Sequence, residues 1–243
     1  MKNLLLFALA LSTASCTAQF PKSLKDAADK ARNATGTTAL GNDEVIAGLK
    51  QALEKGADSA VAMGSIMDGF WKNDRIRIPF PAEAQKVKNT LTDLGIKKPV
   101  EDFERTMNRA AEEAVKEATP VFVDAITGMS ISDGFAILKG GDNAATSYLR
   151  DKTTATLISR FRPIVERATK KVALTSYWTP VANAYNSTVM FTGSKAVDPD
   201  LDAYVTQKAI DGLFVLIAEE ELKIRKDPLA RTTDLLRRVF GAQ

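Results

Sequence analysis

Apolar residues recur at helical spacing along most of the chain beyond residue 43. Asp43 and Glu44 stand where a helix start favours negative charge. The two clearest apolar stripes are Val45, Leu49, Ala52 and Leu53, then Val100, Phe103, Met107, Ala110 and Ala114. No convincing pair of alternating segments indicates paired strands. The pattern therefore predicts an all-α protein, a single multi-helix bundle-like domain over residues 43–243.

The helix boundaries are predicted from cap and turn residues. Ser130 to Asp133 has the Ser-x-x-acid form of a helix start. Gly140 and Gly141 are expected to end that helix, with Asp142 capping the next. Pro163 is expected to begin another helix or to kink the one before it.

The stretch RIRIPFPAE, residues 75–83, interrupts the helical pattern. Its first residues alternate like a strand, but its two prolines stop strand formation. We expect an extended loop that lays Ile76, Ile78 and Phe80 on the core.

Residues 213–218, LFVLIA, are apolar on every side of a helix. A helix of this kind is buried on most of its faces. The helix over about 201–226 is therefore predicted to be the buried central helix, near the C-terminus of the domain.

The N-terminus has the order of a secretory signal. Lys2 is followed by an apolar run over 4–11, too short to span a bilayer, and then by small residues. Cleavage before Cys16, in a sequence that resembles a bacterial lipobox, would leave a lipidated cysteine, whereas cleavage after Ala18 would leave a plain secreted chain. We expect a signal peptide over 1–15, lipidated Cys16 and a tether over 16–42, and an exported protein that is periplasmic or anchored to the outer membrane.

Composition excludes several kinds of chemistry. The chain has no histidine and Cys16 is its only cysteine, so His-based triads, His-ligated metals and thiolate catalysis in the folded part are excluded. The acidic run 198–202 lacks the glycine and glutamate of an EF-hand loop. The net charge of +3 is too mild to predict nucleic-acid binding. We therefore predict no cofactor, no metal site and no nucleic-acid partner.

Five phrases of the chain resemble one known family when taken together in order. They are GFWKNDRIRIPFP, MNRAAEEA, AITGMSISDGFAILKGGDNAATSYLRDKT, FRPIVE and YVTQKAIDGLFVLIAEEELKIRKDPLARTTDLLRRVFG. From about Leu49 to the C-terminus the chain resembles domain-of-unknown-function family 4197. The resemblance implies a helical domain of a bacterial envelope protein with a signal or lipoprotein leader. It implies no activity and no catalytic residue.

Glu220 is the first candidate polar residue. Helical spacing places it on one face with Leu213, Ile217 and Ile224, so it is predicted to interrupt an apolar stripe. Its neighbours are expected to form the pairs Glu219–Lys223 and Glu221–Arg225. A buried Glu220 would be a carboxylate of raised pKa in a pocket, or would form a structural ion pair. The structural interpretation is favoured, and the expected partners are Arg109, Arg150 and Arg231.

A second candidate cluster is Asn108, Arg109 and Glu112, which lie beside alanines that permit close helix approach. A polar network at the bundle centre is favoured over a binding site. The glycines at 140–141, with Arg150 further on, suggest an anion site, but a helix joint is favoured. The C-terminal basic residues suggest contact with anionic headgroups, yet an ion-paired surface is favoured. These residues are Lys223, Arg225, Lys226, Arg231, Arg237 and Arg238.

The function predicted from these observations is that of an envelope lipoprotein whose helical domain binds a ligand or partner, or acts as a scaffold. The expected partners are the membrane, through the lipid anchor, and a lipid, an amphiphile or another envelope protein. The alternative is a carboxylate-dependent enzyme acting on an anionic envelope substrate. It would use Glu220 or Glu112 as acid–base and Arg225 or Arg231 to hold the substrate. A third interpretation gives the polar motifs a purely structural role.

Overall fold

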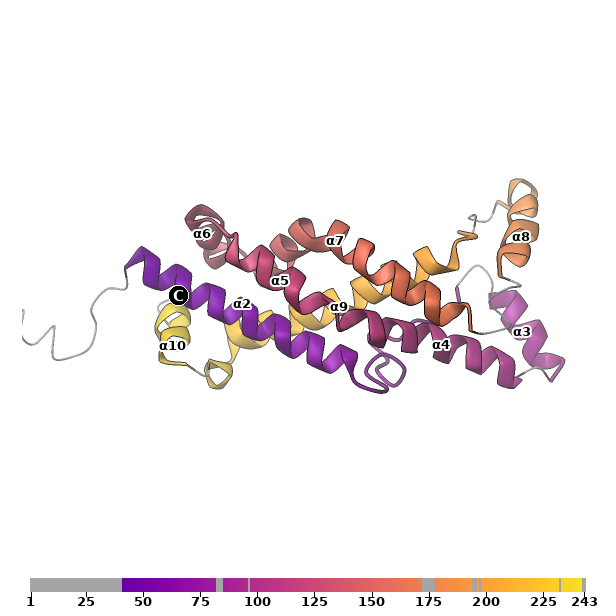
Figure 1. Ribbon diagram of the computed structural model, residues 1–243, viewed down its shortest axis with the longest axis horizontal. Coiled ribbons are helices and arrows are strands. Elements are labelled where there is room, and N and C mark those ends of the chain that lie inside the picture. Colours follow the sequence, from indigo (N-terminus) through magenta and orange to yellow (C-terminus); the bar gives the residue numbers. More distant parts are fainter. Residues whose placement is uncertain are drawn as a thin grey trace, which may run out of the picture. The chain divides into compact units, whose positions relative to one another are not determined.

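The helical pattern of the sequence is realised throughout the described part of the chain. The computed structural model describes residues 41–81, 85–95, 97–171, 178–193, 196, 198–231 and 233–241, which all belong to one compact unit. Within these residues every regular element is helical, which confirms the predicted all-α class (Figure 1). The elements are α2 (Asn42–Ser65), α3 (Gln85–Asp93), α4 (Lys97–Val115), α5 (Ala118–Thr127), α6 (Ile131–Lys139), α7 (Ala144–Thr169), α8 (Trp178–Thr192), α9 (Leu201–Lys226), the short 3-10 helix η3 (Pro228–Ala230) and α10 (Asp234–Gly241). The predictions for Cys16, the leader and the tether lie outside the described residues.

Helix α9 is the central helix of the bundle. It packs against α2, α4 and α7, and Figure 1 shows its yellow-orange ribbon crossing these helices. Leu213, Phe214, Leu216 and Ile217 are buried, while Val215 is partly exposed. The predicted buried central helix near the C-terminus is therefore confirmed.

A stripe of small residues lets α2 lie close to its neighbours. A methyl group added at Gly48 would lie 2.8 Å from Cγ2 of Val239 on α10, and one at Gly64 would lie 3.3 Å from Cγ1 of Val115 on α4. Helices approach this closely only where side chains at the crossing are small. The buried stripe repeats every fourth residue and consists of Gly48, Ala52, Gly56, Ala60 and Gly64.

The start of α6 follows the prediction, but the start of α7 does not. Ser130 and Asp133 form a reciprocal capping box, and Gly140 ends α6. Asp142 was expected to cap α7 and does not, because Asn143 holds the cap position and Asp142 pairs instead with Lys226 at 3.0 Å. The N–H groups at the start of α7 receive a different carboxylate, described below.

The structure also decides how the chain behaves at Pro163 and where α9 begins. Helix α7 continues through Pro163, so no new helix begins there. Asp200 caps α9, where its Oδ1 accepts the N–H of Ala203 at 2.9 Å. The N-terminal start of the central helix is thus set by a local side chain.

Among the described residues, no single helix has both the length and the apolar character needed to cross a membrane. Helices α5 and α6 meet the length and composition requirement only as a pair, with a bend of 105° between them.

Candidate functional site

One face of α4 binds the main chain of the segment that precedes it. Glu104, Asn108 and Glu112 are buried and stand four residues apart, so they form one row along the helix. We call these three residues the clamp, and residues 66–81 the clamped segment. The prediction of a non-helical stretch over 75–83 is confirmed for its described part, 75–81, where Ile76, Ile78 and Phe80 are buried on the core.

Asn108 pairs with the clamped segment as a neighbouring β-strand would. Its Oδ1 accepts the N–H of Ile78 at 2.8 Å, and its Nδ2 donates to the C=O of Ile78, also at 2.8 Å. Nδ2 donates in addition to the C=O of Glu104 at 2.8 Å. The amide therefore satisfies both main-chain groups of a fully buried residue.

The two carboxylates of the clamp hold the ends of the segment. Oε1 of Glu112 accepts the N–H groups of Phe70 and Trp71 at 3.1 and 3.2 Å. Oε1 of Glu104 accepts the N–H of Phe80 at 3.1 Å and also contacts Lys88 at 2.6 Å. Both carboxylates thus combine main-chain donors with a cation, which is the arrangement that makes a buried carboxylate tolerable.

Arg109 ties the clamp to the turn at the end of α2. Its Nη1 lies 2.6 Å from Oε2 of Glu112, and its Nη2 pairs with Asp68. The hydrogen bond to Glu112 raises the pKa of Arg109 above its ordinary value, in spite of the opposing effect of burial. One guanidinium therefore bridges two carboxylates, one of them buried and one at the surface.

The clamp leaves two large apolar side chains exposed on a fixed turn. Ile66 is 60% exposed and Met67 is 80% exposed, directly before Asp68, which has a φ of +68°. Trp71 is half-buried, and the guanidinium of Arg77 lies 4.0 Å from the centre of its ring. We call residues 66–72 the presented turn.

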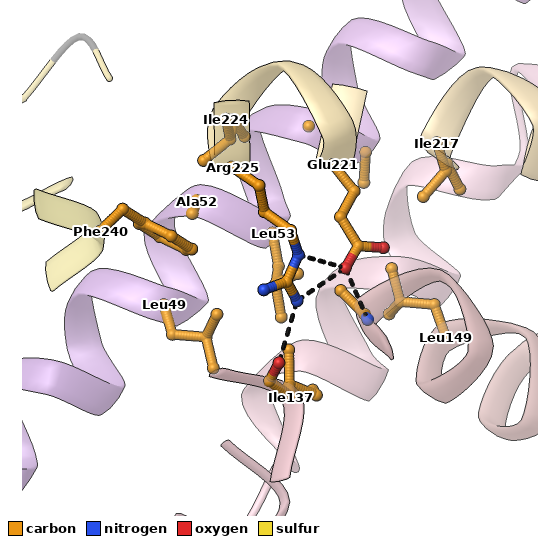
Figure 2. Close-up of a pocket in the computed structure, with 13 residues that line it drawn as sticks. Leu49, Ala52, Leu53, Ile137, Leu149, Ile217, Glu221, Ile224, Arg225 and Phe240 are labelled. Atoms are coloured by element: carbon orange, nitrogen blue, oxygen red, sulfur yellow. Dashed lines mark hydrogen bonds and ion pairs between the residues drawn. The ribbon is translucent and has the colours of Figure 1, made fainter. Parts of the chain in front are cut away.

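A second buried cluster connects α9 to the start of α7 (Figure 2). Oε1 of Glu221 accepts the N–H of Ala145 at 3.0 Å, and Oε2 accepts the N–H of Thr146 at 2.8 Å. Arg225 donates from Nε to the same carboxylate at 2.9 Å and from Nη2 to the C=O of Ile137 at 2.9 Å. A carboxylate of the protein itself therefore occupies the anion-binding N-terminus of α7.

A small cavity of about 30 Å³ lies beside this ion pair. Its walls come from α2, α6, α7, α9 and α10, and they are apolar apart from Glu221 and Arg225. Figure 2 shows several of these side chains around the pair, including Leu49, Leu53, Ile137, Leu149, Ile217 and Phe240. The volume is close to that of a single water-sized group.

Glu220 is partly buried, and its ion-pair partner is not one of the three expected arginines, so the predicted partners are wrong. Its side chain is 14% exposed and pairs with Lys223 at 2.5 Å. Glu221, one residue further on, is buried because it follows Ile217 by four residues and points at α7. Its expected i,i+4 pair with Arg225 is present at 2.8 Å.

The remaining predicted residues occupy separate places. Glu219 pairs with Arg75 at 2.5 Å rather than with Lys223. Arg150 pairs with Asp211 at 3.0 Å, and its guanidinium lies 4.4 Å from the ring centre of Phe214. Neither Arg109 nor Arg150 is the partner of Glu220.

Arg231 binds the C-terminal end of α9. Its Nε donates to the C=O of Ile224 at 3.0 Å, and its Nη2 donates to the C=O of Arg225 at 2.9 Å. The candidate residues therefore form several networks, not one site. Within the described ranges, no group of three or more Cys, Asp or Glu side chains is placed to hold a metal ion.

Sequence reasoning missed Glu104 and underrated Glu221. Glu104 carried a signal, because it continues the four-residue spacing of Asn108 and Glu112. Nothing in the sequence indicated its partner, because Glu104 binds the main-chain N–H of Phe80 and every residue except proline has such a group. The importance of Glu221 followed only from the position of α7.

Comparison with known proteins identifies the family but no characterised relative. No curated protein and no solved structure gives a significant match to the chain. A family model described as "Protein of unknown function (DUF4197)" matches residues 39–241, which is most of the chain. The resemblance found in the sequence is thereby confirmed, and the chain belongs to the DUF4197 family.

Proposed function

We propose that this protein is a bacterial envelope lipoprotein whose helical domain docks another envelope protein through the presented turn, residues 66–72. The observation that carries the proposal is the exposure of Met67, 80%, on a turn whose main chain is held by buried groups. A large apolar side chain on a fixed support is the form of a binding hot spot.

The fixed backbone favours docking because little conformational entropy is lost on binding. Glu112 holds the N–H groups of Phe70 and Trp71, and the ring of Phe70 is fully buried. Arg109 holds Asp68 from the side of α4. A turn whose main chain is held by these contacts loses little backbone entropy on binding, which lowers the cost of association.

The surroundings of the turn indicate the chemistry of the partner. Ile66 and Met67 require an apolar recess, and the stacked Trp71–Arg77 pair offers a flat cationic surface beside it. Lys72 and Arg75 are largely exposed at the same place, although each already contacts an acidic residue of this chain. A protein surface with an apolar pocket and an acidic rim fits this pattern.

The leader supports an anchored location. Lys2, the apolar run 4–11 and the lipobox-like residues before Cys16 are the signals on which it rests. A tether on a membrane surface would raise the effective concentration of the turn toward a partner in the same membrane. Replacement Cys16→Ser is expected to move the exported protein from the membrane fraction to the soluble fraction of the periplasm, as measured by fractionation and immunoblotting.

The docking proposal is tested by photo-cross-linking in cells. A photoreactive amino acid replaces Met67, and a matched control replaces Leu229, which is 88% exposed on η3. We expect one protein adduct of defined mass from position 67 and none of that mass from position 229. Wild-type domain co-expressed and exported in excess should compete the adduct away, whereas co-expressed domain carrying Ile66→Ser and Met67→Asp should not. Adducts with lipid alone, or equal adducts from both positions, would contradict the proposal.

A further inference from the structure

The cavity beside Arg225 is closed by the last helix of the chain. Phe240 of α10 forms one of its walls, and Leu236 and Val239 bury the rest of the apolar face of α10. The packing of α10 is mainly against α2, and it follows the three-residue helix η3. The cover of the cavity is thus a short terminal helix at the edge of the bundle.

Beneath α10 lies an aliphatic surface to which four other helices, α2, α6, α7 and α9, contribute side chains. Leu49 and Leu53 come from α2, Ile137 from α6, Leu149 from α7 and Ile217 from α9. With α10 in place, the open space above this surface is the cavity of about 30 Å³. That volume is too small for a chain of methylene groups. If α10 moves aside, the area now covered by Leu236, Val239 and Phe240 is added to the cavity.

Arg225 supplies one polar group at the edge of this surface. Its side chain is 9% exposed, and its Nε and Nη2 are both hydrogen-bonded. Its Nη1 makes no hydrogen bond to any described residue, and Figure 2 shows the nitrogen without a dashed line on the side of Phe240 and Leu49. A nearly buried guanidinium therefore keeps one donor without a partner among the described residues, beside a cavity whose exposed walls are almost wholly apolar.

A second carboxylate at Arg225 has a parallel within the same molecule. Arg109 holds Glu112 through Nη1 and Asp68 through Nη2, so one guanidinium there already bridges two acids. Arg225 has Glu221 on one side and the unused Nη1 on the other. A carboxylate that arrived at Nη1 would complete the same arrangement.

We propose that α10 covers a binding site for the single acyl chain of a carboxylate-ended amphiphile, such as a free fatty acid. The chain replaces the apolar face of α10 against α2, and the carboxylate binds Nη1 of Arg225. Because α10 and the acyl chain compete for one surface, the closed protein binds weakly and displacement of α10 raises the affinity. The proposal does not depend on the presented turn.

Gly48 provides a direct means of displacing α10. A methyl group at this position would lie 2.8 Å from Cγ2 of Val239 and 2.9 Å from Cγ of Leu235, both on α10. The replacement Gly48→Ala, whose single methyl group leaves most of the α2 surface free, therefore pushes α10 away from α2. We expect this variant to bind oleate at least tenfold more tightly than wild type, measured by displacement of 11-(dansylamino)undecanoate. Unchanged affinity in a folded variant would overturn the proposal.

A reversible lock tests the same point without a risk to folding. The close approach of position 48 to Val239 suits a disulfide between Gly48→Cys and Val239→Cys, in an otherwise cysteine-free chain carrying Cys16→Ser. We expect the oxidised form to bind oleate at least tenfold more weakly than the same protein after reduction. Equal affinities of the two forms would show that α10 does not cover the site.

The role of Arg225 is tested by comparing oleate with oleyl alcohol. In the Gly48→Ala background, Arg225→Lys keeps a cation beside Glu221 but removes the planar fork that carries Nη1. We expect this change to weaken oleate at least fivefold and to leave oleyl alcohol unchanged. Equal losses for both ligands, or no loss for either, would remove the carboxylate from the proposed ligand.

Discussion

Glu221 accepts hydrogen bonds from both the N–H and the hydroxyl of Thr146, each at 2.8 Å, across 75 residues of sequence. The first turn of α7 is therefore capped by a side chain of the central helix and not by a residue of its own loop. The N–H groups at the start of α7 need hydrogen-bond partners, and they obtain them only when α7 packs against α9. Several measurable consequences follow from this contact and from the clamp on α4.

Replacement Glu221→Ala is expected to lower the free energy of unfolding by about 3–5 kcal/mol, because it leaves Arg225 buried without its partner. Urea unfolding followed by circular dichroism measures the change. The matched control is Glu220→Ala, which removes a surface pair with Lys223 and should cost no more than about 1 kcal/mol. Similar losses for the two variants would refute the assignment of Glu221 as the buried cap.

Replacement Asn108→Ala is expected to release the clamped segment. It leaves the N–H and the C=O of Ile78 without partners, at a cost of about 1–3 kcal/mol for each buried group. Hydrogen exchange should accelerate over residues 70–80 and stay unchanged at the centre of α9. Glu113→Gln, which alters only an exposed pair with Lys116, serves as the control and should leave both regions as they are.

Two helical glycines are expected to respond to alanine in opposite directions. A methyl group at Gly56 meets its neighbours at ordinary distances of 3.6 Å or more, so Gly56→Ala should raise stability by about 0.5–1 kcal/mol through helix propensity. At Gly212 the methyl group would lie 2.7 Å from the ring of Phe70, which is fully buried. Gly212→Ala should therefore lower stability by about 1–3 kcal/mol. Thermal unfolding of both variants measures the two changes in stability. An increase in stability for Gly212→Ala would contradict the prediction.

The capping box of α6 is expected to make the free energy of unfolding depend on pH in the acidic range. Hydrogen bonds from the hydroxyl and the N–H of Ser130 hold the pKa of Asp133 below its ordinary value. The unfolded chain thus takes up this proton first as the pH falls. The contribution of the cap is complete above the ordinary Asp pKa of about 3.9 and is lost as pH falls through the lower folded pKa.

The comparison of wild type with Asp133→Asn measures this contribution. Their difference in urea midpoint should be largest at neutral pH and should shrink between about pH 4 and pH 2. A difference that stays constant over this range would show that the charge of Asp133 does not support the helix start.

The sequence specified the helices better than it specified their polar contacts. The buried stretch around Leu213 and the Ser130–Asp133 box were readable because each signal is local. The sequence could not show which of Glu220 and Glu221 is buried. The apolar stripe of α9 is broad, and successive residues differ in direction by only about 100° around the helix axis. Only the position of α7 decides which of the two acids is buried.

The partners of the clamp were hidden for a related reason. Glu104 and Asn108 bind main-chain groups of Phe80 and Ile78, and every residue type offers the same groups. The guanidinium of Arg231 likewise binds carbonyls at the end of α9. Periodicity finds apolar surfaces that must meet, whereas contacts to the main chain depend on the path that the chain takes between helices.

The late position of α9 in the chain has a consequence for synthesis. Helices α2, α4 and α7 all emerge before the helix against which they pack, and the first turn of α7 waits for a carboxylate 75 residues away. A nascent chain that ends before residue 201 already contains the contacts of α4 with α7 and of α2 with α5, but it lacks the helix on which α2, α4 and α7 all pack. The apolar surfaces that α2, α4 and α7 present to α9 are therefore covered only when the last fifth of the chain has appeared.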